Sequence, residues 1–145
     1  MAWQADMARM IVEGFSSSKQ PADHEWVEGT SVVIGPPNDD DVTNDLVIGL
    51  VDRQGPTDET FGHVYGRPNL TVVVRSPKMG ALVGFDVAQD LFLWLTSAEH
   101  ANFMMGETPV QRLDPTAWPG YLRRDAHHRV DVTMEIGVWL GEFDA

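Results

Sequence analysis

The chain has 145 residues, a length that fits one domain able to bury a hydrophobic core without covalent cross-links. It contains no cysteine, which excludes disulfides, thiolate metal sites and cysteine nucleophiles. Ten basic residues against 22 acidic ones give a formal net charge of −12, which is the wrong sign for a protein that grips the phosphates of nucleic acid.

The first half of the chain predicts one helix followed by short strands. Residues 3–14 separate apolar and polar side chains onto two sides, the pattern of an amphipathic helix. Segments 31–34 and 46–51 are short and apolar, so each is a predicted strand. The polar, glycine-rich tract 52–69 is the longest predicted loop. Long loops are often functional, so this tract is an interaction arm, or else a disordered surface loop or a hairpin extension.

A strand that feeds a helix forms the middle of the chain. Residues 70–76 include three consecutive valines, which predicts a central strand buried on both faces. Beyond Pro77 the apolar spacing becomes helical, with one core face. That face consists of Ala81, Phe85, Ala88, Leu91, Phe92 and Leu95. A second stripe of Val83, Val87 and Trp94 is wider than a helix on a small sheet needs to bury, which predicts self-association through it.

The last part of the chain predicts a connector, two strands and a turn-rich tract. The connector covers 96–106, and a strand covers 108–113. The turn-rich tract covers 118–129, and unbroken alternation over 130–140 predicts a long strand with one wet face. The order helix, strands, helix, strands predicts an α+β fold: one domain, 1–145, with a mostly antiparallel sheet and two helices packed on one face.

The acidic run Asp39, Asp40 and Asp41 is the one cluster that resembles a site for a hard cation. A calcium loop needs glycine at its sixth position and glutamate at its twelfth, and counting from Asp39 these fall on Asn44 and Leu50. The run is therefore predicted to be a solvated turn before a strand.

The sequence contains none of the usual carriers of enzyme chemistry. His127 and His128 are adjacent, so they project to opposite sides of an extended chain and cannot chelate one metal together. Nucleophile elbows, phosphate loops and dinucleotide-binding loops are absent from the sequence. No apolar run approaches the roughly 20 residues of a membrane span. We therefore expect no enzyme, no cofactor, no metal and no membrane association; a metal hydrolase would have to draw on Asp39, Asp41 and His128.

The order of elements and the tract Pro-Gly-Tyr-Leu-Arg-Arg-Asp before the last strand resemble the tail terminator and minor capsid proteins of long-tailed bacteriophages. Relatives tend to read glycine-arginine-aspartate, then an acidic residue and a glycine-arginine pair. Arg124, Asp125 and Arg129 match that pattern. The chain departs from the pattern at Arg123, Ala126 and His128, which stand where relatives carry glycine, an acidic residue and glycine.

This resemblance implies a non-enzymatic virion protein that assembles in the host cytoplasm. Its copies form a ring, expected to be a hexamer, that caps the tail tube and joins it to the connector or stopper protein of the neck. DNA passes through the lumen without specific binding. Arg124, Asp125 and Arg129 are expected to fix the start of the last strand or to bridge to a neighbouring subunit. Asp39, Asp40 and Asp41 either line the lumen or lie on the outer surface.

Two alternatives remain open at this point. The first is a head-completion or stopper protein of the connector. The second is a small cytosolic binding module or metal hydrolase, which would be a monomer stabilised by its ligand.

Overall fold

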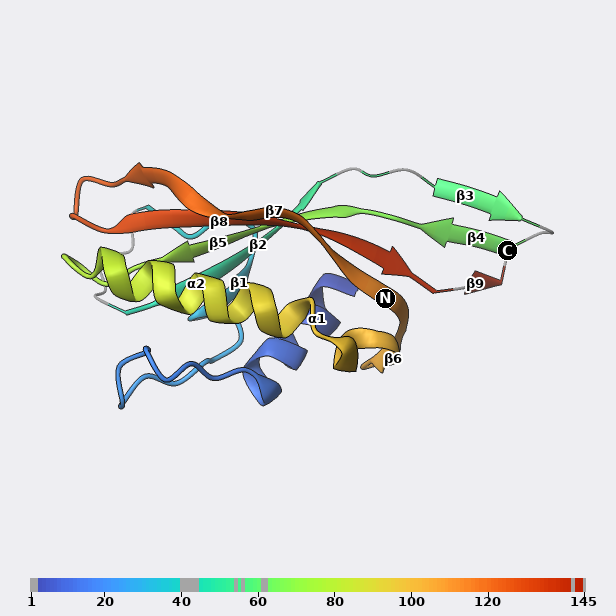
Figure 1. Ribbon diagram of the computed structural model, residues 1–145, viewed down its shortest axis with the longest axis horizontal. Helices are drawn as coiled ribbons and strands as arrows, with labels where there is room; N and C mark the ends of the chain where they lie inside the picture. Colours follow the sequence, from blue (N-terminus) through green and yellow to red (C-terminus); the bar gives the residue numbers. More distant parts are fainter. Residues whose placement is uncertain are drawn as a thin grey trace.

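A computed structural model of the chain describes residues 3–39, 45–53, 55, 57–60, 63–141 and 143–144. A curled sheet forms its centre, and both α-helices lie along one face of that sheet (Figure 1). The helical elements are α1 (Trp3–Gly14), α2 (Ala81–Leu95) and the short η1 (Ala98–His100). The strands are β1 (Val32–Ile34), β2 (Val47–Arg53), β3 (Thr57–Thr60), β4 (His63–Gly66), β5 (Asn69–Arg75), β6 (Ala101–Met105), β7 (Thr108–Arg124), β8 (Val130–Leu140) and β9 (Phe143–Asp144).

The main sheet has six strands in the order β1-β2-β5-β8-β7-β6. Strand β1 pairs in parallel with β2, and every other pairing in this sheet is antiparallel. Strand β5 lies between β2 and β8, and its valines are buried on both faces, as predicted for a central strand. The predicted α+β fold, with a mostly antiparallel sheet and both helices on one face, is confirmed.

The core lies between the helices and one face of the sheet. Alternate residues of β8 point into it, and five of them are nearly inaccessible to solvent: Val130, Val132, Met134, Ile136 and Val138. Leu91 and Leu95 of α2 cover them from the helical side, and Met7 and Ile11 of α1 belong to the same core beside β1, β2 and β6. Each fully buried side chain of this size contributes about 1.5–3 kcal/mol to folding. This shared core places α1 beside α2 under the sheet.

A polar contact ties α1 to the hairpin between β6 and β7. The Thr108 hydroxyl donates to Asp6 Oδ2 over 2.6 Å, and both side chains are buried. Gly106 turns this hairpin with φ +61, and a Cβ there would lie 2.6 Å from Asp6 Oδ1. Glycine therefore meets two demands at this turn, a left-handed backbone and the close approach of a carboxylate.

The tract 52–69 is a hairpin extension, which was one of its three predicted alternatives. Strand β2 continues to Arg53, β3 and β4 pair with each other, and β5 begins at Asn69. With β9, these two strands form a second sheet of three strands beyond the end of the main sheet (Figure 1). The glycine-rich composition of the tract predicted turns. Its strands depend partly on pairing with β9, which lies at the far end of the chain and leaves no local sequence signal.

Two predictions in the last part of the chain are wrong. The connector 96–106 contains η1 and β6, and β7 runs on to Arg124 instead of ending at Leu113. Pro115 and Pro119 favoured the turn-rich tract that was predicted there. In the described part of the chain, however, β6 pairs with β7 only as far as Arg112. Beyond it β7 is an edge strand with register shifts, and an edge strand tolerates proline.

Candidate functional site

The second apolar stripe of α2 packs against the core of its own chain, and Val87, one of its three members, is too deeply buried to contact another subunit as predicted. Val87 is fully buried in the core, and Val83 and Trp94 are partly buried against it. The Trp94 ring lies 5.6 Å from the Phe15 ring, measured between centroids. A Cβ on Gly14 would come within 3.1 Å of the Trp94 ring, so glycine allows this approach. The sequence argument considered only the sheet as a cover and omitted α1.

The polar cluster of the protein lies on the opposite face of the sheet, away from the helices. Arg75 of β5 and Asp131 of β8 are cross-strand partners and are 1% and 2% exposed. Arg75 Nε donates to Asp131 Oδ1 over 2.8 Å, and Nη2 donates to Oδ2 over 3.0 Å. This two-bond geometry satisfies a buried charge pair that would otherwise be costly.

Two exposed side chains complete this network. Arg75 Nη2 also donates to Asp39 Oδ1 over 2.7 Å, and Arg75 Nη1 donates to the Asn38 carbonyl over 3.0 Å. Arg123 of β7 donates from Nε to Asp131 Oδ2 over 3.1 Å and from Nη2 to Asp39 Oδ1. We call Asp39, Arg75, Arg123 and Asp131 the charge network. It joins the three strands β5, β8 and β7 to the segment that follows β1.

The segment 35–39 reaches the network by crossing the face of β2. A Cβ on Gly49 would lie 2.7 Å from both the Gly35 carbonyl oxygen and Pro37 Cδ. Glycine at position 49 therefore lets the segment lie directly on the strand. This contact explains why Val47 and Val73, on the face without helices, are buried.

Pairing within the network favours the charged forms of Asp39, Arg75 and Arg123. Hydrogen bonds from Arg123, and next from Arg75, lower the pKa of Asp39 below its usual range. Burial would lower the pKa of Arg75, but its bonds to Asp131 and Asp39 outweigh burial and raise it. Hydrogen bonding to Asp39 raises the pKa of Arg123. The pairing therefore stabilises these three groups as ions and joins their strands.

Asp39, one of the three lumen candidates, has an exposed side chain that is also paired with the sheet. Its charge is matched by two guanidinium groups on the sheet. The same pairing makes it a poor ligand for a cation, because Arg75 and Arg123 would repel a metal ion. Asp40 and Asp41, the other two lumen candidates, lie outside the described residues.

Asp125 organises the turn between β7 and β8. Its Oδ1 accepts from the backbone N–H groups of His127 and Arg129 over 3.0 and 2.9 Å. Its Oδ2 accepts from Arg129 Nε over 2.8 Å, and both side chains are buried. Burial would raise the pKa of Asp125, but these bonds outweigh it and lower the pKa to about 2. Asp125 and Arg129 thus act within one chain, at the start of the last strand.

Arg124, the third residue that matches the family pattern, has a different environment from Asp125 and Arg129. It ends β7 opposite Val130, and its side chain is exposed. The structure therefore brings Asp125 and Arg129 together and leaves Arg124 at the surface of the strand.

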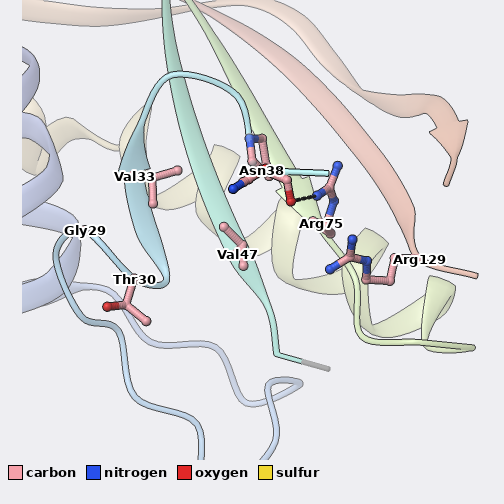
Figure 2. A pocket seen from close by; sticks show the side chains of 8 residues that line it. Gly29, Thr30, Val33, Asn38, Val47, Arg75 and Arg129 are labelled. Carbon is pink, nitrogen blue, oxygen red and sulfur yellow. Dashed lines mark hydrogen bonds between the residues drawn. The ribbon is translucent and has the colours of Figure 1, made fainter. Parts of the chain in front are cut away.

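A cavity of about 240 Å³ opens beside the charge network (Figure 2). Arg75 and Arg129 face it from one side, and Asn38, Thr30, Val33 and Val47 line the rest. Arg75 is paired with Asp39 and Asp131, and Arg129 is paired with Asp125. The lining therefore supplies no surplus positive charge that would attract an anion. Among the residues that the structure describes, no group of three His, Asp or Glu side chains is placed to hold a metal ion.

Sequence reasoning missed Arg75 and Asp131, the two buried members of the network. Asp131 was predicted to lie on the wet face of its strand, whereas it is almost fully buried. A signal was present, because Arg75 ends one apolar strand, Asp131 lies at the start of another, and their charges are opposite. Such a pair stabilises a sheet when the two strands are neighbours in register. Periodicity alone did not pair these strands.

Comparison with protein-family models, with curated proteins and with solved structures finds no match to this chain. In the described part of the chain, neither α-helix combines the length and the apolar character needed to cross a membrane.

Proposed function

We propose that this protein is a structural component of a phage virion, a tail terminator whose copies form a ring at the junction of tail and neck. The ring caps the tail tube and joins it to the connector or stopper protein. The resemblance that implies this role resides in the tract that becomes the turn between β7 and β8. The observation that carries the proposal is therefore the geometry of this turn.

Two of the residues that match the family pattern, Asp125 and Arg129, hold this turn in its conformation. Asp125 accepts three bonds from the turn and pairs with Arg129, so each residue needs the other. His128 stands at a position where relatives carry glycine, and its φ of 60 lies in the left-handed region that favours glycine. The departure at His128 thus falls at a position whose backbone glycine adopts readily.

The charge network also supports an assembly role, because its charged groups bind one another. Its arginines and aspartates are paired with one another and hold β5, β7 and β8 together. Carboxylates held in this way are poor bases and poor metal ligands. The metal hydrolase alternative needed Asp39 as a ligand, and Asp39 contacts Arg75 and Arg123 instead. A function carried by surfaces accounts for this chemistry better than a reaction does.

The net charge of −12 is compatible with a ring through which DNA passes. With a Debye length of about 8 Å at physiological salt, wall carboxylates act only on nearby phosphates. They prevent adhesion of the duplex without barring its passage. Each ring, expected to be a hexamer, would contact the tail tube protein on one side and the connector or stopper protein on the other.

Electron microscopy of the purified protein tests the proposal directly. Annular particles are expected, and rings added to assembled tail tubes should bind one end and stop further elongation. A monomer at all concentrations that binds no tube would refute the proposal. Rings that bind a portal or connector complex but never a tube would instead favour the head-completion alternative.

A further inference from the structure

An exposed apolar patch lies along β7 and the adjoining flank of α2. Leu82 of α2 and Trp118, Tyr121 and Leu122 of β7 are between 53% and 79% exposed. The Trp118 ring packs against the buried Phe92 ring of α2 in an edge-on contact, with 5.3 Å between centroids, so β7 lies against this helix. We call Leu82, Trp118, Tyr121 and Leu122 the β7 patch. Exposed apolar side chains of this size on two neighbouring elements mark an interaction surface.

The edge of β7 is unsuited to pairing with another strand. In the described part of the chain, β6 covers β7 only as far as Arg112, and the rest forms an edge of the sheet. Pro115 and Pro119 lack an N–H group, and the register with β8 shifts near both. Prolines and bulges prevent a second strand from adding to an edge. A partner must therefore contact the side chains of the β7 patch.

A second, smaller apolar surface lies at the opposite edge of the same sheet. Strand β1 ends the sheet on that side, and Ile34 of β1 is 56% exposed. Val27, just before the turn that leads into β1, is 46% exposed. We call Val27 and Ile34 the β1 patch. The two patches cannot meet within one chain, because β2, β5 and β8 separate them.

The two edges carry opposite charge. Residues 115–124 of β7 include Arg123 and Arg124 and no acidic residue. Residues 21–34, which lead into and form β1, include three acidic residues and no lysine or arginine. One of the three, Glu28, already contacts Arg9 of α1 at 3.4 Å, whereas Asp23 and Glu25 are exposed. Arg123 is likewise already paired, with Asp39 and Asp131, so Arg124 is the basic side chain of this edge that complements Asp23 and Glu25 of another copy.

We propose that the β7 patch of one copy binds the β1 patch of the next, so that subunits join head to tail through opposite edges of the sheet. The inference rests on the self-association in the proposed function and names its surfaces. An interface between two different patches leaves one of each free on every dimer, so it continues until a ring closes. A stable contact of this kind buries about 800 Å² on each partner.

The test uses one variant for each patch and a matched control. Tyr121→Glu places a negative charge in the β7 patch, opposite Asp23 and Glu25 of the neighbour. Ile34→Lys places a positive charge in the β1 patch, opposite Arg124. Met104→Glu alters an exposed apolar residue of β6 outside both patches. Circular dichroism confirms that each variant folds, and light scattering after gel filtration gives its mass.

Each patch variant alone should be a monomer, whereas the control should assemble as the unmodified chain does. Mixing the two patch variants should restore association, because each retains the patch that the other has lost. The mixture should form a species of twice the 16.1 kDa of one chain, or larger particles if the introduced charges pair as well. A mixture that stays monomeric would overturn the head-to-tail arrangement.

The remaining outcomes separate this inference from the proposed function. Patch variants that still form rings would overturn the inference and leave the proposed function standing. An unmodified chain that stays monomeric at every concentration would overturn both.

Discussion

Removal of the charge of Asp131 should destabilise the protein far more than removal of an exposed aspartate. In Asp131→Asn, the Arg75 guanidinium stays buried and keeps only Asp39 as a charged partner. Breaking a buried pair by removing one member costs about 3–5 kcal/mol, because an uncompensated charge remains. Asp39 is 58% exposed and offsets part of this cost, so we expect a loss of about 3 kcal/mol. Domains have a total unfolding free energy of only about 5–15 kcal/mol.

Urea unfolding followed by tryptophan fluorescence measures this loss, since the chain contains five tryptophans. With a slope of about 2 kcal/mol per molar urea, the midpoint should fall by roughly 1.5 M. Asp114→Asn is the matched control, because Asp114 forms an exposed ion pair with Arg112 at 3.1 Å. Exposed pairs contribute at most about 1 kcal/mol, so its midpoint should move little.

A second variant separates loss of the pair from loss of the buried charge. Arg75→Met combined with Asp131→Leu removes both buried ions and keeps their volume. Such replacements are often neutral or stabilising, so the double variant should be more stable than Asp131→Asn. The reasoning fails if Asp131→Asn costs no more than Asp114→Asn, or if the double variant is the least stable of the three.

Three further substitutions test other parts of the structure. The pKa of Asp125 is about 2 in the folded chain against 3.8 ordinarily, so its stabilisation is complete above about pH 4 and is lost as pH falls towards 2. Asp125→Asn should therefore flatten the acid side of a plot of urea midpoint against pH. Gly49→Ala should cost about 1–3 kcal/mol in urea unfolding, because the new methyl group overlaps Gly35 and Pro37. His128→Gly should raise the melting temperature, since it removes up to about 1 kcal/mol of left-handed strain; an unchanged or lower value would contradict this.

Elements with a strong apolar period could be predicted from the sequence. The helix at 3–14, the central strand that ends near Arg75 and the strand at 130–140 occur close to their predicted bounds. Each buries its apolar side against the same core, so local pattern and tertiary environment agree. The fold class followed from the order of these elements.

The missed elements depend on pairing between distant segments. Strand β7 was cut short because Pro115 and Pro119 indicate turns locally, and an edge strand accepts them. Strand β6 was missed because it exists through its hairpin with β7. The β7 patch escaped notice for the same reason, since its aromatic residues were assigned to a turn.

In the candidate site too, some residues could be predicted from the sequence and others could not. The family pattern selected Asp125 and Arg129, and the structure joins them in one turn. The pattern gave no indication of Arg75 and Asp131, which meet only because β5 and β8 are neighbours in register. A contact across 56 positions of sequence depends on strand order, which periodicity does not determine.

Arg123 connects the buried network to the surface proposed for assembly. Its guanidinium is held by Asp39 and Asp131, while its strand carries the β7 patch. A charged side chain that is already ordered loses little rotamer freedom when a partner binds, which lowers the cost of association. Asp131→Asn should therefore weaken subunit contacts even under conditions where the monomer remains folded. If its assembly is unchanged while its stability falls, the network serves only the fold of one chain.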